Sequence, residues 1–542
     1  MTDLLTDPLI RAAPHGALSL PGVLAALARD EIASFPAMRP HQAPAWHMFL
    51  VQLAALALVA EDTDEIPTDE ADWARLLRGL TTDFPEDEPW RLVVDDWTKP
   101  AFLQPPVPDG VKLSGEVATA DALDLLITSR NHDLKQAIAR AGAPEDWVFA
   151  LVSLQTMEGY GGAGNHGIAR MNGGSSSRPM LGLAPAQHLA GRAVEPRLGA
   201  HFGRDVEILL ATRDDQLDDR WSHLDYPMEG GLGLSWLAPW PEGSQLKLSE
   251  LDIWFIEVCR RVRLVSRDGT LSARRGTSKA QRIAAKPFNG AVGDPWAPTH
   301  KTEAKSFTLG EADFDYRTLS RLLFGEKGKK GHEANWEIPL LATPTEAEQD
   351  QDTLVLVAQA LSRGNSKTDG FKSRVLPIRH RILRGFGSDD QRARLYELAQ
   401  AQMADIEVFD LAIRNGLARM SAAGERELTK DDYAHAADAR RRFANVVDAV
   451  FFEALWDRFE AQDASEAAVD AVGIAFARRL FERASALFEA ELGAVPCASL
   501  FRWRAEARAR ADFDRTVRRT FPDLFPRQHR PEADDDVDSS AA

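Results

Sequence analysis

The sequence predicts an α+β fold in which a large mixed N-terminal domain, residues 1–374, precedes a C-terminal four-helix bundle, residues 375–530. In the first part, short apolar segments alternate with glycine- and proline-rich turns, without an internal repeat. In the second part, apolar residues recur with the period of a helix, and capping or turn residues end each stretch. Short connections between such helices predict an antiparallel bundle, and the acidic end, residues 531–542, predicts a disordered tail. The four helices are expected over residues 389–414, 430–461, 466–492 and 500–520. The predicted stop and start signals between them are Asn415-Gly416, Thr429 with Asp432, Ser465, Gly493 and Ser499.

Some shorter elements are expected in the N-terminal domain. Proline close to the start of an apolar segment predicts a helix that opens at residues 18–21. The apolar run 45–60 is too short to cross a bilayer and predicts a buried helix. Residues 206–211 predict a buried strand, whereas the prolines of residues 97–106 predict an irregular packed connector.

The charge of the chain is strongly acidic overall but uneven. A formal net charge of −18 argues against nucleic acid as a partner, because phosphate binding requires lysine and arginine. However, residues 260–286 hold nine basic residues and one acid, and residues 501–530 hold nine arginines and four acids. These two segments are either solvated faces or phosphate-binding surfaces.

Cysteine usage and the N-terminal pattern limit the class of protein. The two cysteines, Cys259 and Cys497, lie far apart in sequence, which excludes a disulfide framework and a cysteine-rich zinc site. The histidines show no metal-ligand spacing, so neither a metal nor another cofactor is expected. The N-terminus lacks the pattern of a signal peptide, so a cytoplasmic protein without a membrane partner is expected.

A glycine-rich loop, residues 159–174, is the most distinctive stretch of the sequence. It has seven glycines in sixteen residues, which excludes a stable helix or strand interior. A backbone without β-carbons approaches another molecule closely and turns its N–H groups outward, toward phosphates, sugar edges or a nucleic-acid groove. An ordinary surface turn is the alternative.

The same loop contains a G-x-G-x-x-G pattern at Gly162, Gly164 and Gly167, so a nucleotide-binding enzyme that uses the Gly161–Gly167 segment must be considered. That fingerprint requires a preceding strand, but residues 146–154 have helical spacing. No Gly-Lys-Ser/Thr closes the loop as a Walker motif, and no acid/base pair, activated nucleophile or metal motif lies near it. We therefore expect no enzymatic activity.

Several short motifs, taken in order, resemble the CasA family, the large subunit of the type I-E CRISPR Cascade complex. The resemblance covers most of the chain and includes the predicted C-terminal four-helix bundle. The motifs are Leu4-Leu5-Thr6-Asp7-Pro8, Leu18-Ser19-Leu20-Pro21, the connector at 100–104, Leu154-Gln155-Thr156, the glycine-rich loop and Arg363-Gly364-Asn365-Ser366-Lys367-Thr368-Asp369-Gly370-Phe371.

The resemblance implies a non-catalytic subunit of an RNA-guided antiviral complex that surveys double-stranded DNA. Such a subunit recognises the PAM, the short duplex motif beside the target, through the minor groove, helps to open the duplex and helps to recruit the helicase-nuclease. The implied partners are guide RNA (crRNA), double-stranded target DNA, the helicase-nuclease, and the backbone, small and 5′-handle-binding subunits of Cascade. A free-standing DNA-binding protein is a further alternative, although the net charge argues against it.

The resemblance also assigns roles to individual residues. The PAM contacts in the minor groove fall on Gly161, Gly162, Ala163, Gly164, Asn165 and Lys286. The duplex wedge falls on Lys367 and Thr368, where better-known members carry an amide residue. Contacts with the guide's 5′ handle or with neighbouring subunits fall on Asn131, His132 and Lys135. A DNA strand on the bundle would contact Arg441, Arg442, Arg478, Arg479, Arg504 and Arg508.

Overall fold

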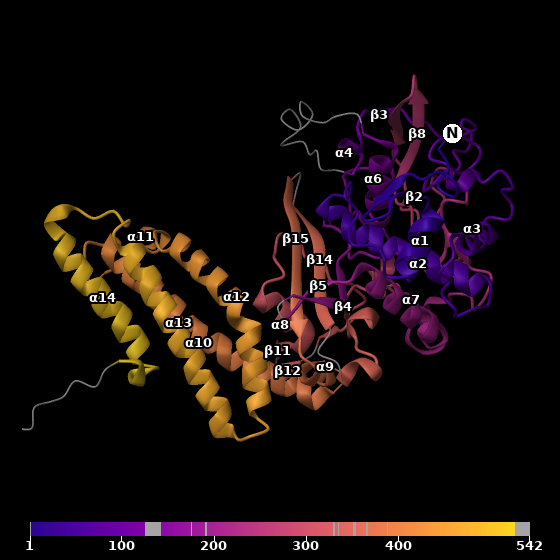
Figure 1. Ribbon diagram of the computed structural model, residues 1–542. Helices are drawn as coiled ribbons and strands as arrows, with labels where there is room; N and C mark the ends of the chain where they lie inside the picture. The colour runs from indigo at the N-terminus through magenta and orange to yellow at the C-terminus, as the bar shows by residue number, and fades with distance from the viewer. Residues whose placement is uncertain are drawn as a thin grey trace, which may run out of the picture. The chain divides into compact units, whose positions relative to one another are not determined.

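The computed structural model divides into two compact units, Met1–Arg392 and Ala393–Ala542 (Figure 1). It describes residues 2–525 except 125–141, 175, 190–191, 329–330, 334, 351–353, 365–366, 387 and 426. The first unit mixes helices with several small sheets, and the second consists of helices in its described part. The predicted α+β class with a helical C-terminal region is therefore confirmed.

The core of the first unit is built around α2 (Ala43–Ala60), most of whose residues are buried, as expected for the apolar run. By length and composition alone this helix with its preceding turn would pass as a membrane span, but here it lies inside the protein core. Around it lie α1 (Leu20–Ala28), α3 (Glu70–Gly79), α6 (Pro144–Met157) and α7 (Leu198–Asp215), with the short α4 (Ala120–Leu123) beside α6. The predicted start of the first helix is confirmed, since the Ser19 hydroxyl accepts the Gly22 N–H at 3.0 Å.

The predicted strand at residues 206–211 is wrong, because these residues lie within α7. Its buried side chains Phe202, Val206, Leu209 and Arg213 recur at intervals of three or four residues, which is the period of a helix face. The short apolar run was compatible with both structures, and only the longer window favours the helix.

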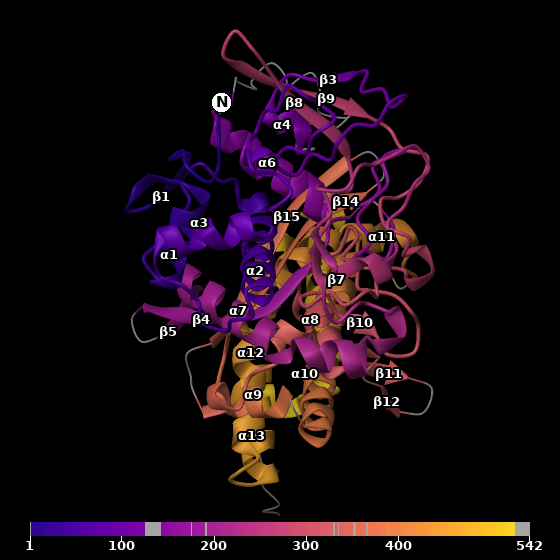
Figure 2. The ribbon, with the colours of Figure 1, turned by 90° about the vertical axis from the view of Figure 1, so that its right-hand side faces the viewer.

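Each sheet of the first unit has two to four strands. The four-stranded antiparallel sheet has the order β15–β14–β4–β5, and a three-stranded antiparallel sheet has the order β3–β9–β8. In both views, β3, β8 and β9 lie at the same end of the unit as α4 and α6 (Figures 1 and 2). The strands are β1 (Ile10–Ala12), β2 (Gly16–Leu18), β3 (Gly115–Val117), β4 (Met180–Leu189), β5 (Arg192–Pro196), β6 (Leu232–Leu234), β7 (Leu251–Ile256), β8 (Arg261–Arg267), β9 (Thr270–Gly276), β10 (Thr299–His300), β11 (Glu326–Gly328), β12 (Gly331–Glu333), β13 (Trp336–Glu337), β14 (Leu354–Gly364) and β15 (Lys367–Ile378).

The proline-rich connector at 97–106 is free of helix and named strand, as predicted, and Gln104 orders it from within. The buried Gln104 amide donates to the Phe102 carbonyl at 3.0 Å and accepts the Leu264 N–H at 2.6 Å. One amide side chain therefore satisfies backbone groups of the connector and of β8, as burial of irregular backbone requires.

The first unit extends beyond residue 374, where the sequence placed the domain boundary. Strand β15 runs to Ile378, and α9 (His380–Phe386) follows with Ile382 and Leu383 fully buried. Helix α8 (Tyr316–Phe324) belongs to the same part of the unit, and its Phe324 ring contacts Phe386 at 6.4 Å between centroids. The boundary falls inside α10 (Asp389–Ser421), because that helix begins in one unit and continues in the other.

The second unit is an antiparallel bundle of α10, α12 (Ala437–Ala461), α13 (Glu466–Leu492) and α14 (Arg502–Arg518), with the one-turn α11 (Lys430–Ala434) before α12. Side-chain contacts fix the directions. Helices α10 and α12 are antiparallel, because Gln402 bonds to Phe451 while Asp410 bonds to Arg440. The stacked rings of Phe488 and Phe513, 4.6 Å apart, join α13 to α14.

Of two helix boundaries in the bundle, one agrees with the sequence prediction and the other does not. Ser465 caps α13 as predicted, since its hydroxyl accepts the Ala468 N–H at 3.1 Å. In contrast, Asn415-Gly416 does not end α10, which continues to Ser421. A β-carbon on Gly416 would lie 2.6 Å from the Phe488 ring, so this glycine permits close packing of α10 on α13.

Candidate nucleic-acid interface

The glycine-rich loop leaves the C-terminal end of α6 and has the conformation of a shaped loop. Gly162 and Gly164 have φ angles of +112° and +73°, a region that residues with a β-carbon rarely adopt. A β-carbon on Gly162 would meet no atom within 4 Å, so this position faces open space at the tip. The loop therefore presents bare backbone at Gly162, between the exposed Gly161 and Ala163.

Hydrogen bonds close the tip into a turn and leave three amides free. Gly161 N–H donates to the Asn165 carbonyl at 2.8 Å, and Asn165 N–H donates to the Gly162 carbonyl at 2.9 Å. Within the described part of the chain, the N–H groups of residues 162, 163 and 164 have no hydrogen-bond acceptor. Three consecutive unpaired donors are suited to acceptor atoms of a ligand.

The segment directly after β9, the central strand of the β3–β9–β8 sheet, packs against the loop. Ser278 N–H, just beyond β9, donates to the Gly164 carbonyl at 2.9 Å, and the His166 ring lies 3.2 Å from the Ser278 carbonyl. Thr277 packs so closely on Gly164 that a β-carbon there would lie 2.5 Å from the threonine β-carbon. Glycine is therefore required at 164 for packing as well as for its backbone angle.

The part of the loop that carries the tip, residues 159–169, is held at both ends by the segment between β7 and β8. Arg260 donates to the Gly159 carbonyl at 2.6 Å, and both oxygens of Glu257 accept the Ala169 N–H, at 2.9 and 2.8 Å. Burial raises the pKa of Glu257 to about 7, against the opposing effect of the Ala169 N–H and nearby arginines. Burial likewise raises the pKa of the Cys259 thiol to about 11, so this cysteine is not a reactive nucleophile.

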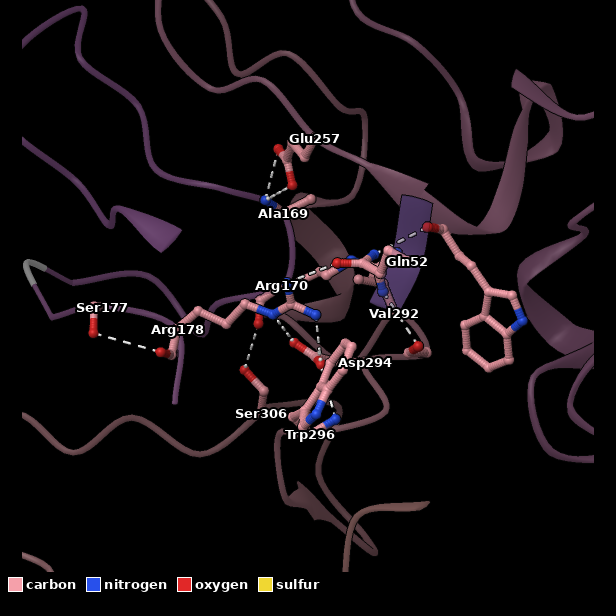
Figure 3. Close-up of polar contacts among 12 residues, drawn as sticks. Gln52, Ala169, Arg170, Ser177, Arg178, Glu257, Val292, Asp294, Trp296 and Ser306 are labelled. Carbon is pink, nitrogen blue, oxygen red and sulfur yellow. Dashed lines mark hydrogen bonds and ion pairs between the residues drawn. The ribbon is translucent and has the colours of Figure 1, made fainter. Parts of the chain in front are cut away.

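Two buried arginines, Arg170 within the loop and Arg178 just after it, fix the path of the chain where it leaves the loop (Figure 3). Arg178 forms a bidentate ion pair with Asp294, at 2.7 and 2.9 Å, and also donates to the Gln52 side chain. Arg170 donates to the carbonyls of Ile253, Phe255 and Gly293. The sequence analysis missed both, because the burial of an arginine depends on carbonyl partners that are remote in sequence.

The structure brings two other predicted contacts toward the same region. Lys286 is exposed and starts a one-turn helix, and Gly290, just after that helix, packs against the backbone of Met171 and Asn172 in the loop. Lys367 and Thr368 begin β15 beside the turn of the β14–β15 hairpin. That hairpin is tied to the base of the loop, since Leu361 N–H donates to the Ser177 hydroxyl at 2.7 Å. Asn131, His132 and Lys135 lie outside the described residues.

The basic segment 260–286 lies only in part on the surface. Four of its nine basic residues are buried and donate to backbone carbonyls: Arg260, Arg261, Arg263 and Arg282. Hydrogen bonds within the fold therefore occupy these four guanidinium groups, and they stabilise it. The others are exposed or half-buried: Arg267, Arg274, Arg275, Lys279 and Lys286.

The candidate arginines of the bundle fall into three pairs. Arg504 and Arg508 donate to the carbonyls of Ala423 and Gly424, so they close the C-terminal end of α10. Arg441 and Arg442 are exposed but paired with Asp438. Arg478 and Arg479 on α13 are exposed and have no partner within the described residues. Of the six candidates, this last pair alone is free to bind an external anion without giving up a bond to another described residue.

One buried cluster has the residue types of a metal site. His47, His201 and Asp205 place one donor atom each within 4.8 Å of one another, and the i, i+4 spacing of His201 and Asp205 was a signal that the sequence analysis overlooked. However, the two imidazole rings stack 3.9 Å apart at 20°, and the Nε2 atoms of His47 and His201 lie 2.9 and 3.3 Å from the same oxygen of Asp205. Trp296 N–H and Arg204 also donate to the carboxylate. This arrangement is a hydrogen-bonded cluster that joins α2 to α7.

A small pocket lies between the loop and the β3–β9–β8 sheet. Its lining includes Gly161, Asn165, Arg260 and Arg275, together with apolar side chains of β3, α4, α6 and β8. Among the described residues that line it, no carboxylate, histidine or thiol is present. The pocket therefore offers guanidinium groups for an anion but no acid/base pair for catalysis.

Comparisons with solved structures identify the fold. CasA of Thermus thermophilus has a TM-score of 0.57 and 15% sequence identity, and the match covers 95% of this chain and 99% of that one. Cse1 of Thermobifida fusca has a TM-score of 0.59 at 15% identity, with 95% and 98% coverage. A chain of a CRISPR RNA-guided surveillance complex has a TM-score of 0.50 at 14% identity, with 94% and 99% coverage.

These structural neighbours confirm, at the level of the fold, the resemblance to CasA that the sequence motifs indicated. No family model matches the sequence. No curated protein matches it either.

Proposed function

We propose that this chain is the CasA-type large subunit of an RNA-guided complex that surveys double-stranded DNA. In this role it contacts the PAM through the minor groove, helps to open the duplex and helps to recruit a helicase-nuclease. The proposal rests on the CasA fold over nearly the whole chain, together with the structural neighbour that comes from a CRISPR RNA-guided surveillance complex. Guide RNA and the other subunits of such a complex are the proposed partners, in the cytoplasm.

The proposed contact with the minor groove is based on the free N–H groups of residues 162–164. Both A·T and G·C pairs present acceptor atoms there, and the groove is only about 6 Å wide, so a narrow backbone with outward N–H donors fits it. Gly162 adds no side chain in that direction, and Ala163 adds only a methyl group. Because the acceptor pattern is nearly the same for different base pairs, such a loop tolerates several PAM sequences.

The decisive experiment compares two glycine variants in the assembled complex. Gly162→Asp places bulk and negative charge at the tip, where the structure leaves open space, and we expect it to abolish duplex binding. Gly173→Asp is the matched control, because Gly173 also has a positive φ angle and open space around its α-carbon but lies at the far end of the loop. Duplex binding is measured by electrophoretic mobility shift with guide RNA loaded. Equal binding by the two variants would refute the minor-groove role.

Nucleotide binding is a second candidate function, because the pocket beside the loop has no carboxylate among its described lining residues. Arg260 and Arg275 supply the positive charge that a phosphate requires. A thermal-shift screen of the purified chain with nucleoside mono-, di- and triphosphates tests it, since a ligand at about 100 times its Kd stabilises by about 2.7 kcal/mol. A shift that disappears in Arg275→Ala would favour a nucleotide site.

A further inference from the structure

The neck of the glycine-rich loop is closed by one four-residue segment, Glu257–Arg260, that neither the sequence motifs nor the fold comparison points to. This segment connects β7 to β8 and is buried throughout. Its first residue bonds to Ala169 and its last bonds to Gly159, which are the two ends of the part of the loop that carries the tip, residues 159–169. The two loop ends also bond to each other, because Ile168 N–H donates to the Glu158 carbonyl at 3.1 Å.

Arg260 bonds to the loop at Gly159 and lies close to Gly161. Its guanidinium donates to the Gly159 carbonyl, and the same terminal nitrogen would lie 3.4 Å from a β-carbon on Gly161. The backbone of Arg260 is itself fixed, since Gln155 of α6 accepts its N–H at 2.7 Å and donates to its carbonyl at 3.0 Å. The arginine therefore joins the loop to both α6 and β8. The hydrogen bonds between Gly161, Gly162 and Asn165 lie within the loop and make no such connection.

We propose that Arg260 and Glu257 are the positioning residues of the loop, which hold its two ends and thereby direct the N–H groups of 162–164 outward. This inference rests on the proposed contact of the loop with duplex DNA. Neither side chain touches the duplex, because both are buried beneath the loop. Their contribution is preorganisation: a loop in its competent shape for about one-tenth of the time binds about tenfold more weakly.

Arg263 provides a matched control for Arg260. It is also a buried arginine in the same strand region, and it also donates to backbone carbonyls, but those belong to Val94, Lys99 and Gln104 rather than to the loop. Replacement of either guanidinium leaves buried carbonyls unpaired, so a general loss of stability is common to both. Only replacement of Arg260 frees the loop.

The test uses the assembled, guide-loaded complex with Arg260→Met, Arg260→Lys and Arg263→Met. We expect Arg260→Met to weaken duplex binding about tenfold, Arg260→Lys to recover part of it through one remaining donor, and Arg263→Met to bind as wild type. Hydrogen exchange measured on peptides from residues 159–174 should accelerate in Arg260→Met and not in Arg263→Met.

The outcomes separate this inference from the proposed function. If Gly162→Asp does not affect duplex binding, the minor-groove role fails, whatever the arginine variants do. If Gly162→Asp abolishes binding but Arg260→Met and Arg263→Met bind alike, the role of the loop stands and the positioning role of Arg260 is overturned. Glu257→Gln adds an independent readout, because it keeps one acceptor for Ala169 and should weaken binding less than Glu257→Leu, which keeps none.

Discussion

Thr277 occupies the space that a side chain on Gly164 would need, with its β-carbon 2.5 Å from the position of an ideal β-carbon at 164. The glycine at the end of the loop tip is thus fixed by a residue more than a hundred positions later in the sequence. The relationship makes the two positions energetically coupled, which a double-mutant cycle measures.

Gly164→Ala should therefore destabilise the first unit by about 1–3 kcal/mol, through the steric overlap and the positive φ angle together. Thr277→Gly alone removes the overlapping atoms, and in the double variant part of the loss should be restored. The remaining loss is the backbone strain at φ +73°. Urea unfolding of the four proteins gives the coupling free energy, and a value of zero would mean that the loop moves away from Thr277 at little cost.

A second glycine, Gly416, is expected to contribute to the stability of the bundle. Gly416→Ala places a methyl group 2.6 Å from the Phe488 ring, so we expect a loss of about 1–3 kcal/mol even though alanine favours helices over glycine. Gly493→Ala is the control, because that glycine has φ −69° and no atom within 4 Å of an added β-carbon. The control should be neutral or slightly stabilising in thermal unfolding. Equal behaviour of the two variants would show that α10 and α13 separate without penalty.

The sequence predicted those elements whose structure depends on local signals. The start of α1, the Ser465 cap, the apolar run of α2 and the helix before the glycine-rich loop were all predictable from residue type and period. The loop itself was recognised as shaped backbone, because glycine density is a local property. Its direction and its free amides depend on Ser278 and Arg260, and no local signal specifies such contacts.

The errors have the same physical origin. Gly416 looked like a helix stop because glycine usually ends helices, but its role is set by Phe488 of another helix. The basic segment 260–286 looked like a surface patch, whereas Arg263 and Arg282 bond to carbonyls of remote loops. In each case the residue type is compatible with two roles, and the tertiary partner decides between them.

Glu257 should give stability a measurable dependence on pH. Its folded pKa is about 7 and its ordinary value is 4.5, so the folded protein binds more protons at this site between those values. The stabilising contribution of Glu257 to the free energy of unfolding is fully present below about pH 4.5 and is lost as pH rises through about 7. Arg170, Arg178 and Arg260 lie near and oppose the shift, so burial is the larger effect.

Glu257→Gln isolates this contribution, since the amide stays neutral at every pH. We expect the variant to gain stability relative to wild type as pH rises from 5 to 8, by at most about 3 kcal/mol. His201 contributes with the opposite sign, because its pKa is lowered to about 4 and its contribution is lost as pH falls, but it is present in both proteins and cancels in the difference. The measurement is the unfolding free energy of both proteins across this pH range, and a constant difference would contradict a buried carboxyl that titrates near 7.

The arginines of the bundle give a last prediction, which separates free guanidinium groups from internally bonded ones. Arg478 and Arg479 have no partner among the described residues, whereas Arg504 and Arg508 hold the carbonyls at the end of α10. Arg478→Ala with Arg479→Ala should therefore leave the unfolding temperature unchanged, but reduce the slope of log K against log salt for duplex binding by about 1.8 if both contact phosphates. Arg504→Ala with Arg508→Ala should instead lower the unfolding temperature, because the carbonyls of Ala423 and Gly424 lose their donors. An unchanged salt slope in the first double variant would place the DNA elsewhere on the protein.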